Sequence, residues 1–251
     1  MFLKNFKPKN SSLRFRININ KKLLNLVKFK KLFYKIKNNS GRNITGKITI
    51  RHKGSGIFNF RRNVDIFRNY SNSENSFISY DIDKKFSTFL ALFKFSNGNR
   101  SYILAPDNLN KKQNITTTFY HSSTFDGYCL PLGWIKNNTI IYNIEGNPER
   151  GGKYAKSAGT YGLVIHHSVD SVLVKLPSKQ LKYFSKFSLA SLGRCSNILH
   201  FFKNKGKAGV SRYYNIRPTV RGETMNPIDH PMGGRTRGGK PTKNPWGKII
   251  K

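Results

Sequence analysis

Positive charge is the feature that most constrains this chain. Its 251 residues include 46 lysines and arginines but only 11 aspartates and glutamates, so the formal net charge is +35. The first acidic residue is Asp65. Because so much like charge opposes compaction, we expect a polyanion to neutralise it. Phosphate neutralisation by Lys and Arg releases counterions, and the composition therefore predicts a nucleic-acid partner.

A membrane surface is also anionic, but the sequence offers little that would insert into one. The densest apolar run is FLALF at 89–93. That run is far shorter than a bilayer-spanning helix, and no long amphipathic helix accompanies it. We therefore expect no membrane insertion.

Cysteine and histidine usage argues against a metal centre. Cys129 and Cys195 are far apart and form no CxxC pair, which favours two small buried thiols in a reducing compartment. His166 and His167 are adjacent, and neighbouring residues on a strand point to opposite faces. We predict neither a metal nor any other protein-bound cofactor.

The apolar pattern after residue 40 predicts short strands. In ITGKITIRH, Ile44, Ile48 and Ile50 alternate with polar residues, as in a half-buried strand. The run FLALFKF at 89–95 leads through Asn97-Gly98 into RSYIL, which predicts a hairpin because this dipeptide readily adopts positive φ angles. These segments indicate a small barrel.

A second small β unit is predicted further along the chain, from TIIYNIE, GLVIHH, SVLVKLP and QLKYFSKFS. One larger β-sandwich is the alternative to two units. The resulting division is a basic arm at 1–38, β domains at 39–118 and 119–199, and a Gly/Pro/Arg-rich extension at 200–251. The arm has patches of helical spacing at 23–36. A transit peptide is the alternative, but sparse Ser and a preference for Lys favour an arm kept in the mature protein.

Two glycine-rich segments in the β region are candidate phosphate contacts. GRNITGKITIRHKGSG at 41–56 lacks the GK[ST] and following helix of a nucleotide-binding loop, but its glycines would let an RNA backbone approach. GNPERGGKYAKSAGTYGLVI at 146–165 combines glycines, cations and a ring before a strand, and an ordinary loop is its alternative. The candidates are Arg42, Lys47, Arg51, His52, Lys53, Lys153, Lys156 and Tyr161.

The third candidate segment begins at residue 207 and includes VRGETMNPIDHPMGGRTRGGKPTKNPWGK at 220–248. Prolines remove backbone donors and glycines raise the entropy cost of ordering, so we expect an extended segment that an outside partner orders. Tyr213 and Tyr214 offer stacking surfaces and the arginines can bind phosphate or base edges. The candidates are Lys207, Arg212, Arg217, Arg221, Asn226, His230, Arg235 and Arg237.

Enzymatic alternatives have little support in the sequence. His230 follows Asp229, but no nucleophile elbow accompanies it, so contact with RNA or with its own loop is the preferred role. An RNA- or DNA-modifying enzyme would need a cofactor loop or an acid/base cluster. A free-standing single-strand binder is a third hypothesis, and it leaves the extension unexplained.

Several of these segments resemble the universal large-subunit ribosomal protein two family. GRNITGKITIRHKGSG, YILAP at 102–106, GGKYAKSAGTY at 151–161, SLGRCSN at 191–197 and KAGVSRYYNIRPTVRGETMNPIDHPMGG at 207–234 occur in the order of that family. The similarity covers roughly residues 41–248. Three positions differ from the family pattern. Ser55 stands where the family usually has Gly, and Tyr213 stands where it often has Trp. Met232 stands where a second His is usual.

The resemblance implies a complete set of expectations. The fold class would be all-β, with an oligonucleotide-binding-type barrel, an SH3-like barrel and basic terminal extensions. The chain would be a non-enzymatic structural constituent that binds large-subunit rRNA near the peptidyl transferase centre and supports subunit association and tRNA placement. Its partners would be large-subunit rRNA, neighbouring ribosomal proteins and the small subunit across the intersubunit face. Any Mg²⁺ would be structural and held by rRNA.

Residue usage suggests where such a ribosome operates. Lys, Asn, Ile and Phe are abundant, which is typical of A/T-rich genes in organellar genomes. We therefore expect the mitochondrial large ribosomal subunit, with a plastid or an A/T-rich bacterium as alternatives.

Overall fold

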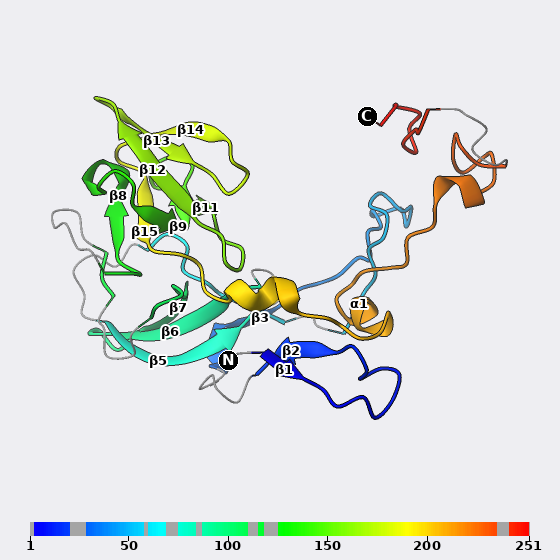
Figure 1. Cartoon of the computed structure of the whole chain (residues 1–251), viewed down its shortest axis with the longest axis horizontal. Helices are drawn as coiled ribbons and strands as arrows, with labels where there is room; N and C mark the ends of the chain where they lie inside the picture. The colour runs from blue at the N-terminus through cyan, green and yellow to red at the C-terminus, as the bar shows by residue number, and fades with distance from the viewer. Residues whose placement is uncertain are drawn as a thin grey trace. The chain divides into compact units, whose positions relative to one another are not determined.

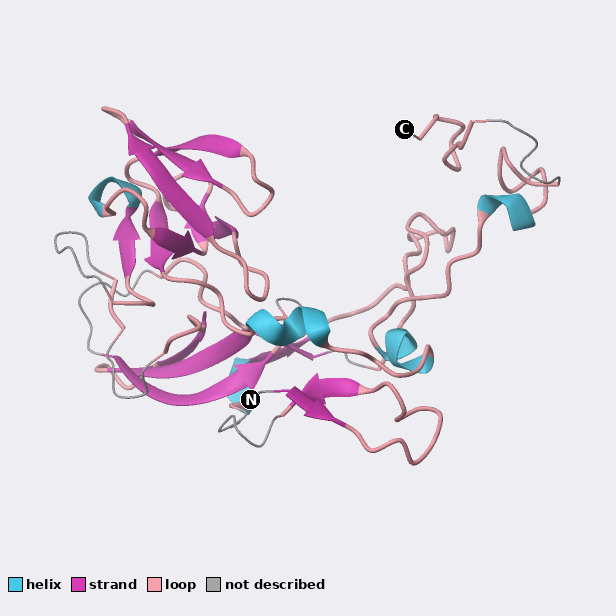
Figure 2. Cartoon of the chain, viewed as in Figure 1, coloured by secondary structure: helices cyan, strands magenta, loops and turns pink. Residues whose placement is uncertain are grey.

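The computed structural model describes residues 3–20, 29–57, 60–68, 75–83, 87–109, 115–117, 125–234 and 241–250. Strands and loops dominate this part of the chain, and the helical segments are short turns (Figure 2). The predicted all-β class is therefore confirmed. In chain order the elements are β1 (Leu3–Asn5), β2 (Ile17–Ile19), η2 (Lys30–Leu32), β3 (Phe33–Lys35), β4 (Phe60–Arg62), β5 (Asn75–Ile82), β6 (Phe89–Phe95), β7 (Arg100–Leu104), β8 (Cys129–Pro131), η3 (Leu132–Trp134), β9 (Ile140–Tyr142), β10 (Ile144–Glu145), β11 (Gly152–Tyr154), β12 (Gly162–His167), β13 (Ser171–Lys175), β14 (Leu181–Ser185), β15 (Leu189–Leu192), η4 (Ile198–Phe202), α1 (Gly209–Tyr213) and η5 (Gly222–Thr224).

The chain folds as two compact units, each assembled from separate stretches of sequence. Unit 1 comprises residues 1–36 and 59–207, and unit 2 comprises residues 37–58 and 208–251. No helix among the described residues is long and apolar enough to cross a membrane.

Unit 1 contains a curved antiparallel sheet in the order β5-β6-β7 (Figure 1). The hairpin predicted at Asn97-Gly98 joins β6 to β7, and Gly98 takes a φ of 82° there. The Gly98 amide donates to the carbonyl of Phe95 at 2.9 Å. A positive φ costs glycine little, so this local signal fixes the register of the two strands.

A second, six-stranded sheet of unit 1 has the order β14-β13-β12-β9-β15-β8, with antiparallel neighbours. The four predicted strand segments of this region appear as β9 with β10, β12, β13 and β14. One buried apolar cluster contains residues of both sheets, and the Tyr142 hydroxyl donates to the carbonyl of Leu104 at 3.1 Å. Cys129 and Cys195 are buried free thiols, as predicted.

The N-terminal arm is tied into unit 1 by backbone pairing. Strand β1 pairs with β2, and Ile17 forms an isolated antiparallel bridge with Asn204. The described part of the stretch with helical spacing is the short turn η2 followed by β3, which pairs with β4. Residues 23–28 of that stretch lie outside the described ranges.

The predicted strand in ITGKITIRH is wrong. Its isoleucines are exposed, with Ile48 at 62% and Ile50 at 48%, and the segment forms turns. The side chain of Asn43 accepts a hydrogen bond from the Lys47 amide at 2.9 Å, and Gly46 takes a φ of 79°. Turn formation by Asn and Gly therefore overrides the alternating pattern.

Candidate nucleic-acid interface

Two glycine-rich segments that are far apart in the sequence lie side by side in unit 2. Lys53 forms an isolated antiparallel β-bridge with Ile216, and the Gly54 amide donates a hydrogen bond to the carbonyl of Asn215 at 2.9 Å. The Arg217 amide donates to the carbonyl of His52, also at 2.9 Å. The first and third candidate segments therefore form one ribbon, which we call the basic ribbon (residues 41–57 with 208–221).

Glycine is required where the two strands of the basic ribbon meet. Gly56 has a φ of 57°, and a Cβ there would overlap the side chain of Asn215. At Gly54 the requirement is weaker, because a Cβ there would make only an ordinary contact with the Arg217 side chain at 3.4 Å. Gly56 therefore admits a distant part of the same chain, and the approach of an RNA backbone to these glycines stays a prediction.

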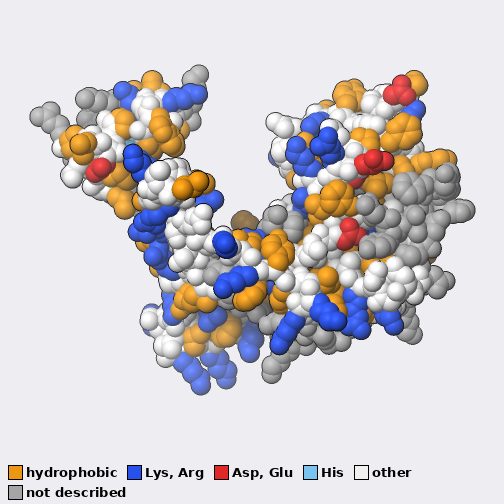
Figure 3. Space-filling view, turned by 180° about the vertical axis from the view of Figure 1, so that it is seen from behind, with side chains coloured by type: hydrophobic (Ala, Val, Ile, Leu, Met, Phe, Trp, Pro, Cys, Tyr) orange, Lys and Arg blue, Asp and Glu red, His pale blue; other side chains and the backbone are white. Residues whose placement is uncertain are grey.

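The cations of the basic ribbon point to solvent. Unit 2 as a whole contains 14 lysines and arginines but only two acidic residues, Glu223 and Asp229. Figure 3 shows Lys and Arg side chains gathered along this unit on the face in view. Such a surface suits repeated phosphate contacts. The exposed cations are Arg42, Lys47, Arg51, Lys53, Arg212, Arg217 and Arg221.

Both histidines predicted as RNA contacts have structural partners. A ring nitrogen of His52 lies 3.2 Å from the carbonyl oxygen of Pro218. His230 is buried, and its Nδ1 accepts a hydrogen bond from the Met232 amide at 3.1 Å. A Cβ at Gly222 would lie 2.3 Å from the His230 ring, so this glycine lets the ring pack against the backbone. His230 therefore shapes the turn at 222–234.

The remaining candidates of the C-terminal extension are placed individually. Asn226 is exposed, and its carbonyl accepts from the amides of Asp229 and His230 at 3.0 and 3.3 Å. Lys207 is exposed at the end of the second stretch of unit 1. Arg235 and Arg237 lie outside the described residues.

The second glycine-rich segment lines a pocket of about 500 Å³ in unit 1, which we call the basic pocket. It brings together Lys153 and Lys156, as the sequence predicted, and adds Arg150 and Lys182. Lys182 comes from β14 and has no sequence signal that links it to the glycine-rich segment. Tyr161 lies elsewhere, with the Arg194 guanidinium 5.2 Å from its ring centre.

Buried polar contacts hold the loop of the basic pocket in shape. The carboxylate of Glu145 is buried and accepts from the amides of Gly151 at 3.0 Å and Leu189 at 2.9 Å. A Cβ at Gly152 would lie 2.0 Å from the Asn143 side chain, so the loop needs glycine there. The pocket is therefore lined by this loop, β11 and β14, and Glu145 of β10 holds the loop in place.

Tyr154 is the aromatic group of the basic pocket. The Lys182 ammonium donates to its hydroxyl at 2.7 Å and lies 4.9 Å from its ring centre, while the Lys153 ammonium is 5.7 Å from the same ring. The hydrogen bond from Lys182, aided by the charges of Lys182 and Lys153, lowers the pKa of the Tyr154 hydroxyl. An anion entering this pocket would meet four cations and one polarised ring.

No group of three or more histidine, cysteine, aspartate or glutamate side chains suited to a metal ion occurs within the described ranges.

The cations of the basic ribbon and the basic pocket lie on small β elements and glycine-rich turns. These features define the class of nucleic-acid-binding proteins.

Comparison with known proteins identifies the family. The RNA-binding N-terminal domain of ribosomal proteins L2 matches residues 13–117, and their C-terminal domain matches residues 126–247. The chain belongs to the ribosomal protein L2 family, whose members are structural constituents of the large ribosomal subunit. The two domains of this family are the oligonucleotide-binding-type and SH3-like barrels that the sequence implied.

Individual relatives come from bacteria and from a mitochondrion. The large ribosomal subunit protein uL2 of Orientia tsutsugamushi is 39% identical, with 100% of this chain and 93% of the relative covered. The protein uL2m of Reclinomonas americana is also 39% identical, with 98% and 90% covered. The protein uL2 of Mycoplasmoides gallisepticum is 38% identical, with 95% and 88% covered.

Proposed function

We propose that this chain is a non-catalytic constituent of the large ribosomal subunit that binds large-subunit rRNA through the basic ribbon and the basic pocket. The pairing of residues 52–57 with 213–217 carries this proposal, because it joins two cationic segments into one phosphate-binding surface. Contacts between such cations and the phosphates of RNA position a protein on the RNA without reading the base sequence.

The placement within the ribosome follows from the family resemblance. The C-terminal extension lies near the peptidyl transferase centre, and the protein supports subunit association and tRNA placement while RNA performs catalysis. Its neighbours are large-subunit rRNA, other ribosomal proteins and the small subunit. Any Mg²⁺ at this interface is held by rRNA.

The host ribosome in this proposal is mitochondrial. The abundance of Lys, Asn, Ile and Phe supports an organellar gene, and the similarity to uL2m of Reclinomonas americana agrees with it. Bacterial relatives are equally similar, so a plastid or bacterial ribosome is the competing outcome of the test.

Cell fractionation followed by gradient sedimentation of an epitope-tagged chain tests both parts of the proposal. We expect the chain in the mitochondrial fraction, at the large-subunit position, before and after a high-salt wash. Recovery in large subunits of another compartment would overturn the mitochondrial assignment alone. Recovery at the top of the gradient, as a free-standing single-strand binder would give, would overturn the ribosomal role.

A further inference from the structure

A second pocket of unit 1, of about 520 Å³, differs from the basic pocket in charge and polarity. Its apolar floor includes Leu130, Ile140 and Leu192, from β8, β9 and β15. Trp134 lies at its edge and is 54% exposed. We call it the mixed pocket, because its lining also contains two carboxylates and two cations.

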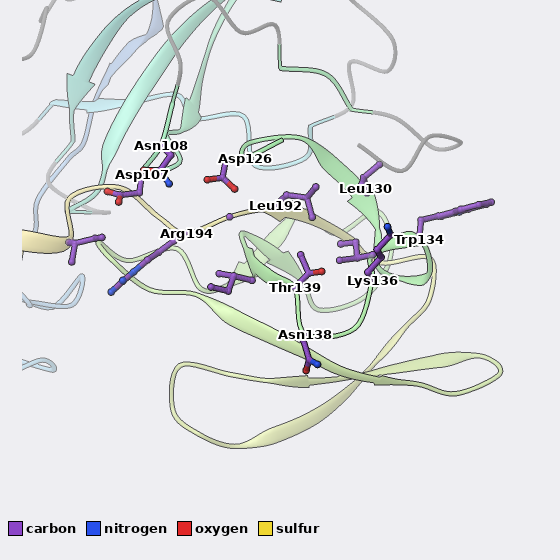
Figure 4. Close-up of a pocket in the computed structure, with 14 residues that line it drawn as sticks. Asp107, Asn108, Asp126, Leu130, Trp134, Lys136, Asn138, Thr139, Leu192 and Arg194 are labelled. Atoms are coloured by element: carbon purple, nitrogen blue, oxygen red, sulfur yellow. The ribbon is translucent and has the colours of Figure 1, made fainter. Parts of the chain in front are cut away.

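The carboxylates of the mixed pocket lie together at one end. Figure 4 shows Asp107 and Asp126 there, beside Asn108, with Trp134 and Lys136 at the opposite end. Gly193 allows this arrangement, because it has a φ of 98° and a Cβ on it would lie 2.7 Å from an Asp126 carboxylate oxygen. The position of Asp126 at the acidic end therefore depends on glycine at residue 193.

Burial raises the pKa of the Asp107 and Asp126 carboxyls above their usual range. For Asp107, the charge of Asp126 raises the pKa further and the nearby Arg194 lowers it. Asp107 is exposed and Asp126 is half-buried, so both can be reached by a partner, and a cation beside two neighbouring carboxylates favours their charged forms. Arg194 is already engaged, since its Nε donates to the carbonyl of Gly159 at 2.8 Å and its guanidinium lies on the ring of Tyr161.

This chemistry disfavours RNA as the occupant. The basic pocket is lined by four cations and no acid, whereas the two aspartates of the mixed pocket balance Lys136 and Arg194. A phosphate next to two carboxylates would be repelled, and the apolar floor offers it no donor. An apolar side chain followed by a cation fits the floor and the acidic end together.

We propose that the mixed pocket binds an extended basic segment of a neighbouring ribosomal protein. An apolar side chain of that segment lies on Ile140 and Trp134, and a Lys or Arg pairs with Asp107 and Asp126. The proposal rests on the proposed function, because the partner is another protein of the same subunit.

Photocrosslinking in assembled large subunits tests this inference. Ile140 is replaced by photoreactive benzoylphenylalanine in the full chain, and Lys153 of the basic pocket receives the same replacement as a matched control. We expect protein adducts from position 140 and RNA adducts from position 153. Mass spectrometry should place the adduct from position 140 within a few residues of a Lys or Arg in the partner.

Charge reversal separates specific binding from mere proximity. Asp107→Lys with Asp126→Lys should lower the yield of the protein adduct by about tenfold. Asp170→Lys is the control, because Asp170 is exposed and pairs with Lys186 outside the pocket, and it should leave the yield unchanged. RNA adducts at position 140, a yield insensitive to reversal, or no adduct in assembled subunits would each overturn the inference. Absence of the chain from subunits would instead overturn the proposed function, and this inference with it.

Discussion

Arg62 binds Asp81 with two nitrogens on one edge of its guanidinium group. Its Nε donates to Oδ2 and its Nη2 donates to Oδ1, each at 2.9 Å. Asp83 lies 3.9 Å from the same guanidinium, which also sits 4.4 Å from the ring centre of Phe33. These contacts join β3, β4 and β5. In a chain with so few acidic residues, two of them stabilise the fold at this point.

Removing this guanidinium should destabilise unit 1 strongly. Arg62→Ala removes the cation that the buried Asp81 carboxylate binds in two hydrogen bonds, and we expect the free energy of unfolding to fall by about 3–5 kcal/mol. Urea denaturation of the purified chain measures it. Lys186→Ala breaks an exposed pair with Asp170 and should cost less than about 1 kcal/mol. Equal costs for the two variants would contradict this account of Arg62.

Gly222→Ala should disturb the turn around His230. The added Cβ would overlap the imidazole ring of His230, so the ring must move. This movement would break the hydrogen bond that the Met232 amide donates to its Nδ1. We expect the Met232 amide to exchange its hydrogen at least about tenfold faster. Gly209→Ala is the control, because nothing lies within 4 Å of a Cβ there. If both variants exchange like the wild type, His230 does not organise this turn.

Cations of the basic pocket should contribute separately to RNA binding. Arg150→Ala and Lys153→Ala each remove a charge that lines the pocket. We expect each to reduce the slope of log affinity for large-subunit rRNA against log salt by about 1. Filter binding over a salt series measures this slope. The same slope for Arg150→Ala, Lys153→Ala and the wild type would exclude the basic pocket from the interface.

The two thiols should be inert while unit 1 is folded. Burial raises the pKa of Cys129 to about 11 and that of Cys195 to about 12. Ellman's reagent at pH 8 should therefore label neither thiol until denaturant is added. Above pH 9 the unfolded thiols ionise first, so the free energy of unfolding should fall as pH rises towards these values. A rapidly labelled thiol in the native chain would contradict the burial of that cysteine.

Local signals in the sequence predicted the fold where neighbouring residues determine it. Asn97-Gly98 specified the β6–β7 hairpin because the turn needs a positive φ, which Gly98 adopts. The same reasoning failed at residues 44–50, where alternation suggested a strand but Asn43 and Gly46 form turns. Alternation marks a strand only when a partner strand pairs with its edge and another layer of the fold covers its apolar face.

Long-range pairings had no local signal. Nothing near Gly54 indicates that it meets Asn215, and nothing near Lys182 indicates that it joins Lys153 in the basic pocket. Residue type and glycine content nevertheless identified all of the exposed cations of the basic ribbon. Charge could be predicted from composition, whereas the surface that groups the charges depends on tertiary pairing.

The salt dependence of binding between the purified chain and large-subunit rRNA tests the central claim most directly. If the basic ribbon and the basic pocket neutralise phosphates, log affinity should fall linearly with log salt, with a slope of about −0.7 to −0.9 for each phosphate contacted. We predict a steep slope that reflects several contacts. An affinity that hardly changes with salt would contradict the claim that phosphate neutralisation by these cations holds the chain on RNA.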